Sequence, residues 1–356
     1  MNSYYTTNYT HCSSYPSTLA YFSSSDYVKT SMHINTCLTL PLSVYGCYCV
    51  IKVTPKELKH AKWALFHVHF WTIVMDVGTN IVYVPCVFFP APALLILGCG
   101  NYLGIPPWFI CYAGGALVAI YTSAAIGLVE NRHSVLQTTW KIHQKWISYL
   151  VNCFNYTIST FIMLPSFLEP VDSQSMALET LKIIPCPVKD FFNPGLYFMT
   201  NNLYLLTRLM IVLSVILLIQ GGFYVIHTWY HLVYAHNTRV SAETRKLQLK
   251  FFVGSLMQIG IPFVTFAMPL LYGFFSFYTS YYNQGDENTQ DVQLTYDVSV
   301  FNNFAVCAIS LHGLLGTSCM LLAHKPYRTH LIANTVGKVF KVQTSPVFIR
   351  VSKTHV

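Results

Sequence analysis

The sequence contains few charged residues for its length. Only 10% of its 356 residues are Asp, Glu, Lys or Arg, whereas soluble globular domains carry about 25%. No charged residue occurs between Asp76 and Glu130. This scarcity excludes a soluble domain. Together with repeated uncharged runs of membrane-spanning length, it indicates an all-α polytopic membrane protein.

Motifs typical of enzymes are also lacking. Gly98-Cys99-Gly100 begins like a dinucleotide-binding loop, but Leu103 stands where the third glycine belongs and no βαβ pattern surrounds it. The sequence has no phosphate-binding loop and no Gly-x-Ser-x-Gly motif. We therefore expect no enzymatic activity and no cofactor.

Metal-binding patterns are incomplete. The 11 cysteines are scattered and form no zinc-type pairs. His67 and His69 are two residues apart and point to different faces of a helix. His227 and His231 have the spacing that zinc requires, but no Glu or Cys accompanies them. The sequence therefore predicts no metal site.

Seven runs have the length of a membrane-spanning helix, which takes about 20 residues. They lie at about 31–51, 63–89, 105–129, 146–168, 197–226, 251–282 and 298–323. Five prolines lie within these spans, namely Pro41, Pro85, Pro165, Pro262 and Pro269. Neighbouring helices can satisfy the carbonyl groups that a proline leaves without a hydrogen bond, and the helix kinks there. We expect a seven-helix bundle over residues 31–323, and the absence of an internal repeat weighs against a duplicated transporter fold.

Basic residues predict the orientation of the bundle. With seven spans, 17 of the 21 Lys and Arg residues fall on the loops and tail of one side. The positive-inside rule makes this side cytoplasmic. The distribution explains the net charge of +8 without nucleic acid as a partner. Residues 1–30, which contain no signal peptide, are then extracellular, and Asn8 in Asn8-Tyr9-Thr10 becomes a glycosylation site.

The tail, residues 324–356, is predicted to be cytoplasmic. Between Tyr327 and Phe340 apolar residues gather on one face, and Arg328, Lys338 and Lys341 supply positive charge. This pattern indicates a short amphipathic helix on anionic membrane lipid. A disordered basic tail is the alternative.

The third span has a stripe of small residues and ends in charge. Gly115, Ala119, Ser123 and Gly127 recur every four residues, so neighbouring helix backbones can approach closely and the span is expected in the middle of the bundle. It ends in Glu130-Asn131-Arg132, which is either a solvated helix end or a site for a partner.

Polar residues inside the other spans are candidate site residues. Asp76 should face the bundle interior, either as a cation or polar-network switch or as a protonated or hydrogen-bonded packing residue. Arg208 either extends toward the outer surface or anchors an acidic ligand group. Gln258 lies within the sixth span.

Several motifs together resemble the nematode serpentine chemoreceptors of class H over about residues 31–330. They are Lys62-Trp63, His69-Phe70-Trp71, Asp76, Phe89-Pro90, Leu103-Gly104-Ile105-Pro106, Glu130-Asn131-Arg132, Pro185-Cys186-Pro187, Gln258 with Pro262 and Pro269, and His324-Lys325-Pro326-Tyr327-Arg328. The resemblance implies a seven-helix G-protein-coupled receptor in the ciliary membrane of a sensory neuron. Its ligand would be a small environmental chemical or pheromone, and its partner a heterotrimeric G protein.

The resemblance also implies roles for particular residues. Glu130-Asn131-Arg132 looks like the acidic-Arg-aromatic triplet of rhodopsin-like receptors in altered order, while the Asn-Pro-x-x-Tyr motif is missing from the last span. A disulfide from the start of the third span to Cys186 is implied, with Cys111 favoured over Cys99 as the partner.

For the mechanism we expect a ligand to shift the population between two helix arrangements, with Pro262 and Pro269 as hinges of the sixth span. Opening the cytoplasmic end would expose Arg132 to the G protein. The competing hypothesis is a small-solute transporter or channel in which Asp76 and Arg208 line the path.

Overall fold

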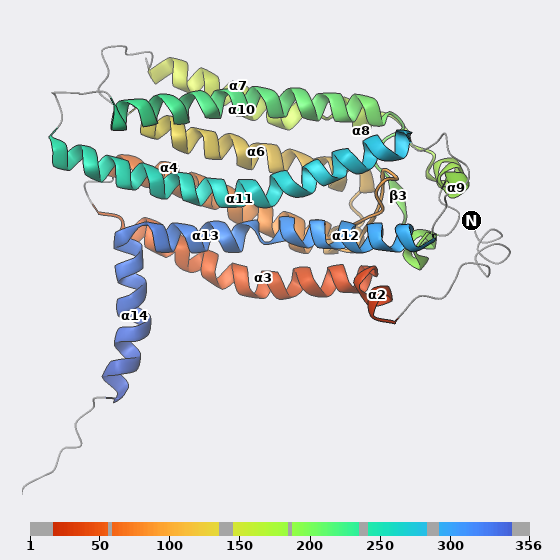
Figure 1. Cartoon of the computed structure of the whole chain (residues 1–356), viewed down its shortest axis with the longest axis horizontal. Helices are drawn as coiled ribbons and strands as arrows, with labels where there is room; N and C mark the ends of the chain where they lie inside the picture. The colour runs from red at the N-terminus through yellow and green to blue at the C-terminus, as the bar shows by residue number, and fades with distance from the viewer. Residues whose placement is uncertain are drawn as a thin grey trace, which may run out of the picture.

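The computed structural model describes residues 17–55, 59–134, 145–183, 187–234, 241–282 and 292–343. Long helices run side by side along one axis (Figure 1). Their bounds are α3 Ser25–Tyr48, continued by the π-helix η2 Cys49–Val53; α4 Lys59–Val77, continued by η4 Gly78–Tyr83; α6 Pro107–Ser134; α7 Lys145–Phe161; α10 Leu203–Val233; α11 Ala242–Tyr282; α12 Val292–Ser310; and α13 His312–Ala323. The short helices are α2 Ser17–Phe22, α5 Cys99–Tyr102, α8 Pro165–Leu168, α9 Ser173–Ile183 and the 3-10 turn η5 Lys189–Phe192.

Six segments of the described chain are long and apolar enough to cross a membrane. They are Ser25–Val53, Pro107–Ser134, Trp146–Leu168, Leu203–Val233, Ala242–Gly273 and Val298–Ala323. The more polar α4 packs between α3 and α6 and supplies the seventh element of the bundle. The chain therefore has the fold of a polytopic helical bundle.

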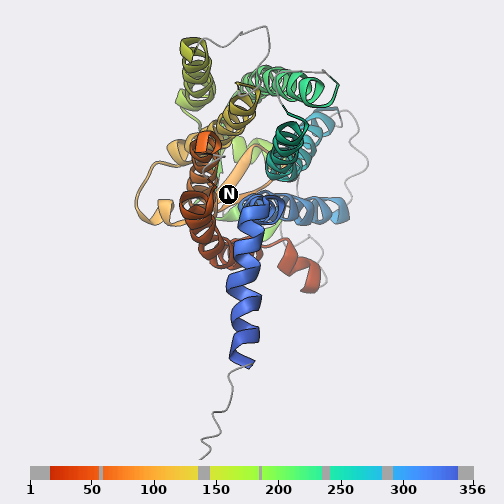
Figure 2. The ribbon, with the colours of Figure 1, turned by 90° about the vertical axis from the view of Figure 1, so that its left-hand side faces the viewer.

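The helix α6 lies among α4, α7, α10 and α11, all of which it contacts. Of the six membrane-length segments it has the largest buried share, 56% against 17% for the segments that contain α7 and α10. Its small residues permit this position, because Ala119 and Ser123 are buried and Gly115 approaches Met163 closely. Helix α7, by contrast, lies at the edge of the bundle (Figure 2).

A small antiparallel sheet covers one end of the bundle, in the order β1-β2-β3. Its strands are β1 Pro85–Val87, β2 Ala93–Ile96 and β3 Tyr197–Phe198. Leu95 and Phe198 of the sheet belong to one buried hydrophobic cluster with Phe191 of η5, Val28 of α3 and Val306 of α12. We call this the sheet end, and the opposite end, where the last helix leaves, the α14 end.

Two predicted spans were too long at the sheet end. The second span stops at Tyr83 instead of residue 89, because Val84 has a positive φ of 42° and Pro85 starts β1 without an amide hydrogen for a helix. The fifth begins at Leu203 instead of residue 197, where Asn202 caps α10 by accepting from the Leu205 amide at 3.0 Å.

Other boundaries also differ from those predicted. The first span begins at Ser25 and the sixth at Ala242, both earlier than expected. The fourth is divided, since α7 ends at Phe161 and Pro165 opens the separate helix α8. Pro85 and Pro165 therefore do not kink continuous helices, whereas Pro41 lies inside α3.

The last span is broken at Leu311 into α12 and α13. After His324 the chain turns into α14 Lys325–Gln343, which points away from the bundle (Figures 1 and 2). A helix over the predicted tail segment 327–340 is therefore present.

Candidate functional site

The break at Leu311 organises a polar network in the middle of the bundle. It leaves carbonyl groups near the break that side chains contact. His312 Nδ1 lies 3.0 Å from the Ile309 carbonyl oxygen. Asn35 of α3 donates to the Ser310 carbonyl at 2.5 Å, and Asn80 of η4 does so at 3.5 Å. Such partners are required because an unsatisfied polar group away from water is costly.

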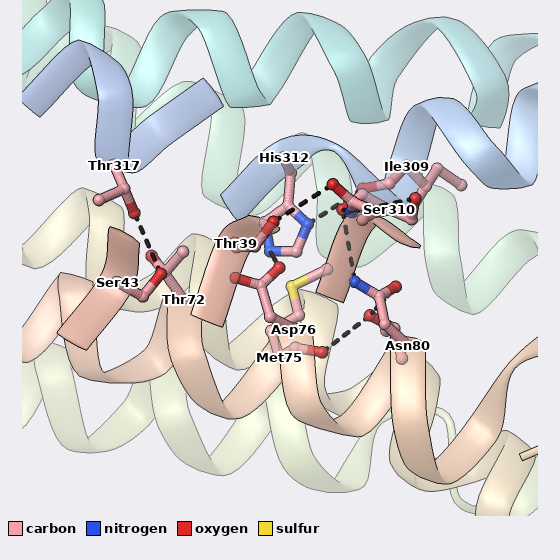
Figure 3. A network of polar contacts seen from close by, with 12 residues as sticks. Thr39, Ser43, Thr72, Met75, Asp76, Asn80, Ile309, Ser310, His312 and Thr317 are labelled. Atoms are coloured by element: carbon pink, nitrogen blue, oxygen red, sulfur yellow. Dashed lines mark hydrogen bonds and ion pairs between the residues drawn. The ribbon is translucent and has the colours of Figure 1, made fainter. Parts of the chain in front are cut away.

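Asp76 faces this break from α4, as Figure 3 shows. Its Oδ1 lies 3.4 Å from His312 Nε2, and both carboxyl oxygens are buried without a hydrogen-bond partner in the described part of the chain. A Cβ atom at Gly313 would stand only 1.8 Å from Asp76 Oδ2. Only glycine at position 313 therefore leaves room for the carboxyl group.

Short polar side chains extend the network along α3. Thr39 donates to Asn35 Oδ1 at 3.2 Å, and the hydroxyl groups of Ser43 and Thr317 lie 3.4 Å apart. Beside Asp76 is a cavity of about 10 Å³, which has room for about one water molecule.

Glu130 is a second buried carboxyl group, near the α14 end of α6. It is 3% exposed and faces α7, from which Ser148 donates to Oε1 at 2.5 Å and Asn152 donates to Oε2 at 2.7 Å. The side chains of Glu130, Asn131, Ser148 and Asn152 line a groove of about 460 Å³ between α4, α6 and α7.

Arg132 points in another direction, toward α11. Its guanidinium carbon lies 4.1 Å from the centre of the Phe251 ring. Nε and Nη2 are buried and have no hydrogen-bond partner among the described residues. The arginine is thus held by ring contact in a place where two of its three nitrogens donate no hydrogen bond to the described residues.

The residues His324 to Arg328 lie beside this arginine. The ring centres of His324 and Phe251 are 4.5 Å apart, and burial, reinforced by the Arg132 charge, lowers the pKa of His324 to about 4. Tyr327 is 1% exposed and its hydroxyl lies 2.7 Å from that of Thr54.

The other residues between His324 and Arg328 are more exposed to the surroundings. Lys325 and Arg328 are exposed, Pro326 is half-buried, and Arg328 donates to the Leu322 carbonyl at 3.2 Å. We call Arg132, Phe251, His324 and Tyr327 the inner cluster.

The remaining predicted residues are dispersed. Gln258 is buried on α11 with Oε1 unpartnered in the described structure. Pro262 and Pro269 both lie within α11, which changes direction about half-way along (Figure 1). Arg208 is exposed, so it does not share an interior path with Asp76, and the transporter hypothesis loses its second lining residue.

The predicted covalent features stay predictions. Cys99 and Cys111 are both free thiols in the structure, and Cys186 lies outside the described residues. Asn8 also lies outside them.

Sequence reasoning missed several contributors to the network. His312, Gly313, Asn35 and Asn80 were not among the candidates, although three of them are polar residues within otherwise apolar spans. A polar residue within an apolar span is a signal by which these three residues could have been predicted. It does not predict that they meet near Leu311. Phe251 carried no signal that separates it from an ordinary lipid-facing aromatic residue.

A bundle of membrane-length helices with a polar network in its interior defines a multi-pass helical membrane protein. The family model described as serpentine type seven-transmembrane GPCR chemoreceptor Srh matches residues 23–335. The chain therefore belongs to the Srh family of serpentine chemoreceptors.

A relative supports this assignment. The chain is 28% identical over 338 residues to serpentine receptor class H-72 of Caenorhabditis elegans, which covers 92% of this chain and 90% of the relative. The resemblance drawn from the motifs is thus confirmed, and the chain is a GPCR-type chemoreceptor of a receptor family, not of an enzyme family.

Proposed function

We propose that this chain binds a small environmental chemical or pheromone in its sheet-end half and then activates a heterotrimeric G protein at its α14 end. The family and the concentration of basic residues on one side of the bundle support this orientation, with the N-terminus extracellular and the C-terminus cytoplasmic. The proposed location is the plasma membrane of a sensory cilium, with α14 on the inner lipid surface.

The observation that carries the proposal is the unused hydrogen-bonding capacity of Arg132. A guanidinium group has five N–H donors in a fixed fork. In the inner cluster it contacts a ring, and two of its nitrogens have no acceptor in the described structure. A partner that offers carbonyl or carboxylate oxygens at this end would satisfy these donors and stabilise an arrangement in which the cluster is open.

Helix α11 is the element that connects ligand binding to this cluster. It carries Phe251 near its α14 end, and Pro262 and Pro269 lie farther along it. Both prolines lack an amide hydrogen, which permits the helix to bend there. A ligand that binds better when α11 is displaced would shift the population toward the open cluster, since equal affinity for both arrangements shifts nothing. The Phe251 ring would then leave Arg132.

The test is ligand-dependent guanine-nucleotide exchange on a Gα subunit, with the full chain reconstituted in lipid bilayers. We expect exchange with the wild type, and at least a tenfold loss in Arg132→Met. Arg208→Met, at the opposite end of the bundle, controls for the loss of an arginine, and ligand binding is measured in both variants so that a ligand contact at Arg208 is recognised. Solute flux through the same bilayers without nucleotide exchange would instead establish a transporter.

A further inference from the structure

The hydrogen-bond pattern of His312 determines where the protons on its ring lie. Nδ1 is 3.0 Å from the Ile309 carbonyl oxygen, which can only accept a hydrogen bond. Nδ1 must therefore carry a hydrogen. In a neutral imidazole the other nitrogen, Nε2, is then an acceptor, and this is the atom that faces Asp76 Oδ1 at 3.4 Å.

An ionised Asp76 would place its lone pairs against the lone pair of Nε2. Such an arrangement is repulsive, and neither atom has a hydrogen-bond partner among the described residues. A single added proton removes the conflict, because it can lie on either atom and be attracted by the other. The close approach of Asp76 to His312 therefore requires one proton for the pair.

The surroundings favour the carboxyl group as its carrier. No donor reaches either oxygen of Asp76, and the His312 ring lies against the rings of Tyr121 and Phe266, with centres 5.8 and 4.9 Å away. An ion pair in such a place loses the hydration of both charges without hydrogen bonds to replace it. A neutral acid beside a neutral imidazole avoids that loss.

Few other groups compete for this proton. Among the described residues, the titratable groups that face Asp76 are His312 of α13 and Tyr121 of α6. The α3 side of the neighbouring cavity offers Thr36, Thr39, Leu40 and Ser43, none of which titrates in the usual range. On α4 itself the nearest such group is His69, two turns away and bonded to the Ser43 carbonyl at 2.8 Å.

We propose that Asp76 and His312 together form a binding site for one proton, carried by Asp76 in this conformation, and that releasing it opens the break between α12 and α13. Release transfers the proton to water, for which the adjacent cavity has room, and leaves one negative charge on Asp76. The carboxylate then repels Nε2, and His312 moves away with the start of α13. The hydrogen bonds at Ser310 and Ile309 are disturbed as a result.

The first test is infrared spectroscopy of the full-length wild-type chain in lipid bilayers. We expect a carboxylic-acid C=O band that shifts in D₂O, is absent in Asp76→Asn, and persists in Glu130→Gln. Glu130 is the matched control because it is equally buried but receives two donors. Absence of the band in the wild type, or its survival in Asp76→Asn, would overturn the proposal.

The second test measures the break itself. Spin labels at the exposed positions Phe301 of α12 and Leu322 of α13 lie on opposite sides of Leu311. Raising the pH until the acid band disappears should change the distance between the labels in the wild type. In Asp76→Asn, which cannot ionise, the distance should be independent of pH. An unchanged distance in the wild type would refute the coupling to the break. Neither measurement requires a G protein, so a failure here is separate from a failure of the proposed receptor function.

Discussion

Asp76 and Glu130 are both carboxylic acids buried inside the bundle, 6% and 3% exposed, yet their surroundings are opposite. Glu130 accepts hydrogen bonds from Ser148 and Asn152 across α6 and α7. Asp76 receives none from the described residues and faces a ring nitrogen that has to act as an acceptor. Burial alone therefore does not determine the surroundings of a carboxyl group, because the side chains on the neighbouring helices decide which hydrogen bonds it receives.

The two regions also differ in how closely the backbones approach. The Asp76 carboxyl group of α4 lies directly against the Gly313 backbone of α13, so these two helices are close together there. Around Glu130, by contrast, α6 and α7 are far enough apart to leave the groove. The middle of the bundle should therefore tolerate added volume least, and the Glu130 region should tolerate lost hydrogen bonds least.

The largest effect is expected from Gly313→Ala. The new methyl group would overlap Asp76 Oδ2, and overpacking of this kind costs about 1–3 kcal/mol or more. Thermal unfolding of the purified protein should show a large drop in Tm. Gly222→Ala is the control, since its Cβ would meet nothing within 4 Å. The double variant with Asp76→Ala should recover most of the loss; no recovery would contradict the contact.

Glu130→Gln should be the next most damaging change. The amide nitrogen of glutamine cannot accept from Ser148 or Asn152, so a buried donor loses its acceptor, at about 1–3 kcal/mol. Asp76→Asn removes no hydrogen bond described in the structure and should change stability by less. Measured free energies of unfolding in the reverse order would contradict the comparison between the two regions.

The inner cluster should be sensitive to acid through His324. Its pKa in the folded chain is about 4, below the ordinary 6.5, so the unfolded chain binds the proton more readily between these values. The contribution of His324 to the free energy of unfolding is therefore fully present above about pH 6.5 and is lost as the pH drops toward 4. We expect the free energy of unfolding to fall by about 2 kcal/mol between pH 7 and pH 5. Unfolding of the wild type and of His324→Asn over this range should show a steeper loss of stability in the wild type than in the variant.

The smallest effect is expected from Ser43→Ala, and the same substitution at Ser148 calibrates it. Ser43 lies 3.4 Å from Thr317 between two neutral hydroxyl groups, which is worth about 0.5 kcal/mol or less. Ser148 donates to the Glu130 carboxyl group at 2.5 Å, and its loss should cost about 1–1.5 kcal/mol. Equal shifts in Tm for the two variants would show that the regions do not differ in this respect.

Much of the architecture could be predicted because lipid imposes a simple rule on the sequence. The helix number followed from the length of uncharged runs, and the central place of α6 followed from Ala119, Ser123 and the neighbouring glycines. The ends of the spans were less predictable. Residues 85–87 are as apolar as the helix before them, and only their pairing with residues 94–96 places them in a sheet.

The sequence by itself determined the membrane-spanning class, the family and the side on which positive charge collects, because each depends on composition along the chain. Tertiary structure alone decided that His312 meets Asp76, that Glu130 and Arg132 face different helices, and that Arg208 lies outside. The physical reason is that these facts depend on helix rotation and on a break at Leu311. Both are set by contacts between residues up to 275 positions apart, such as Asn35 and Ser310.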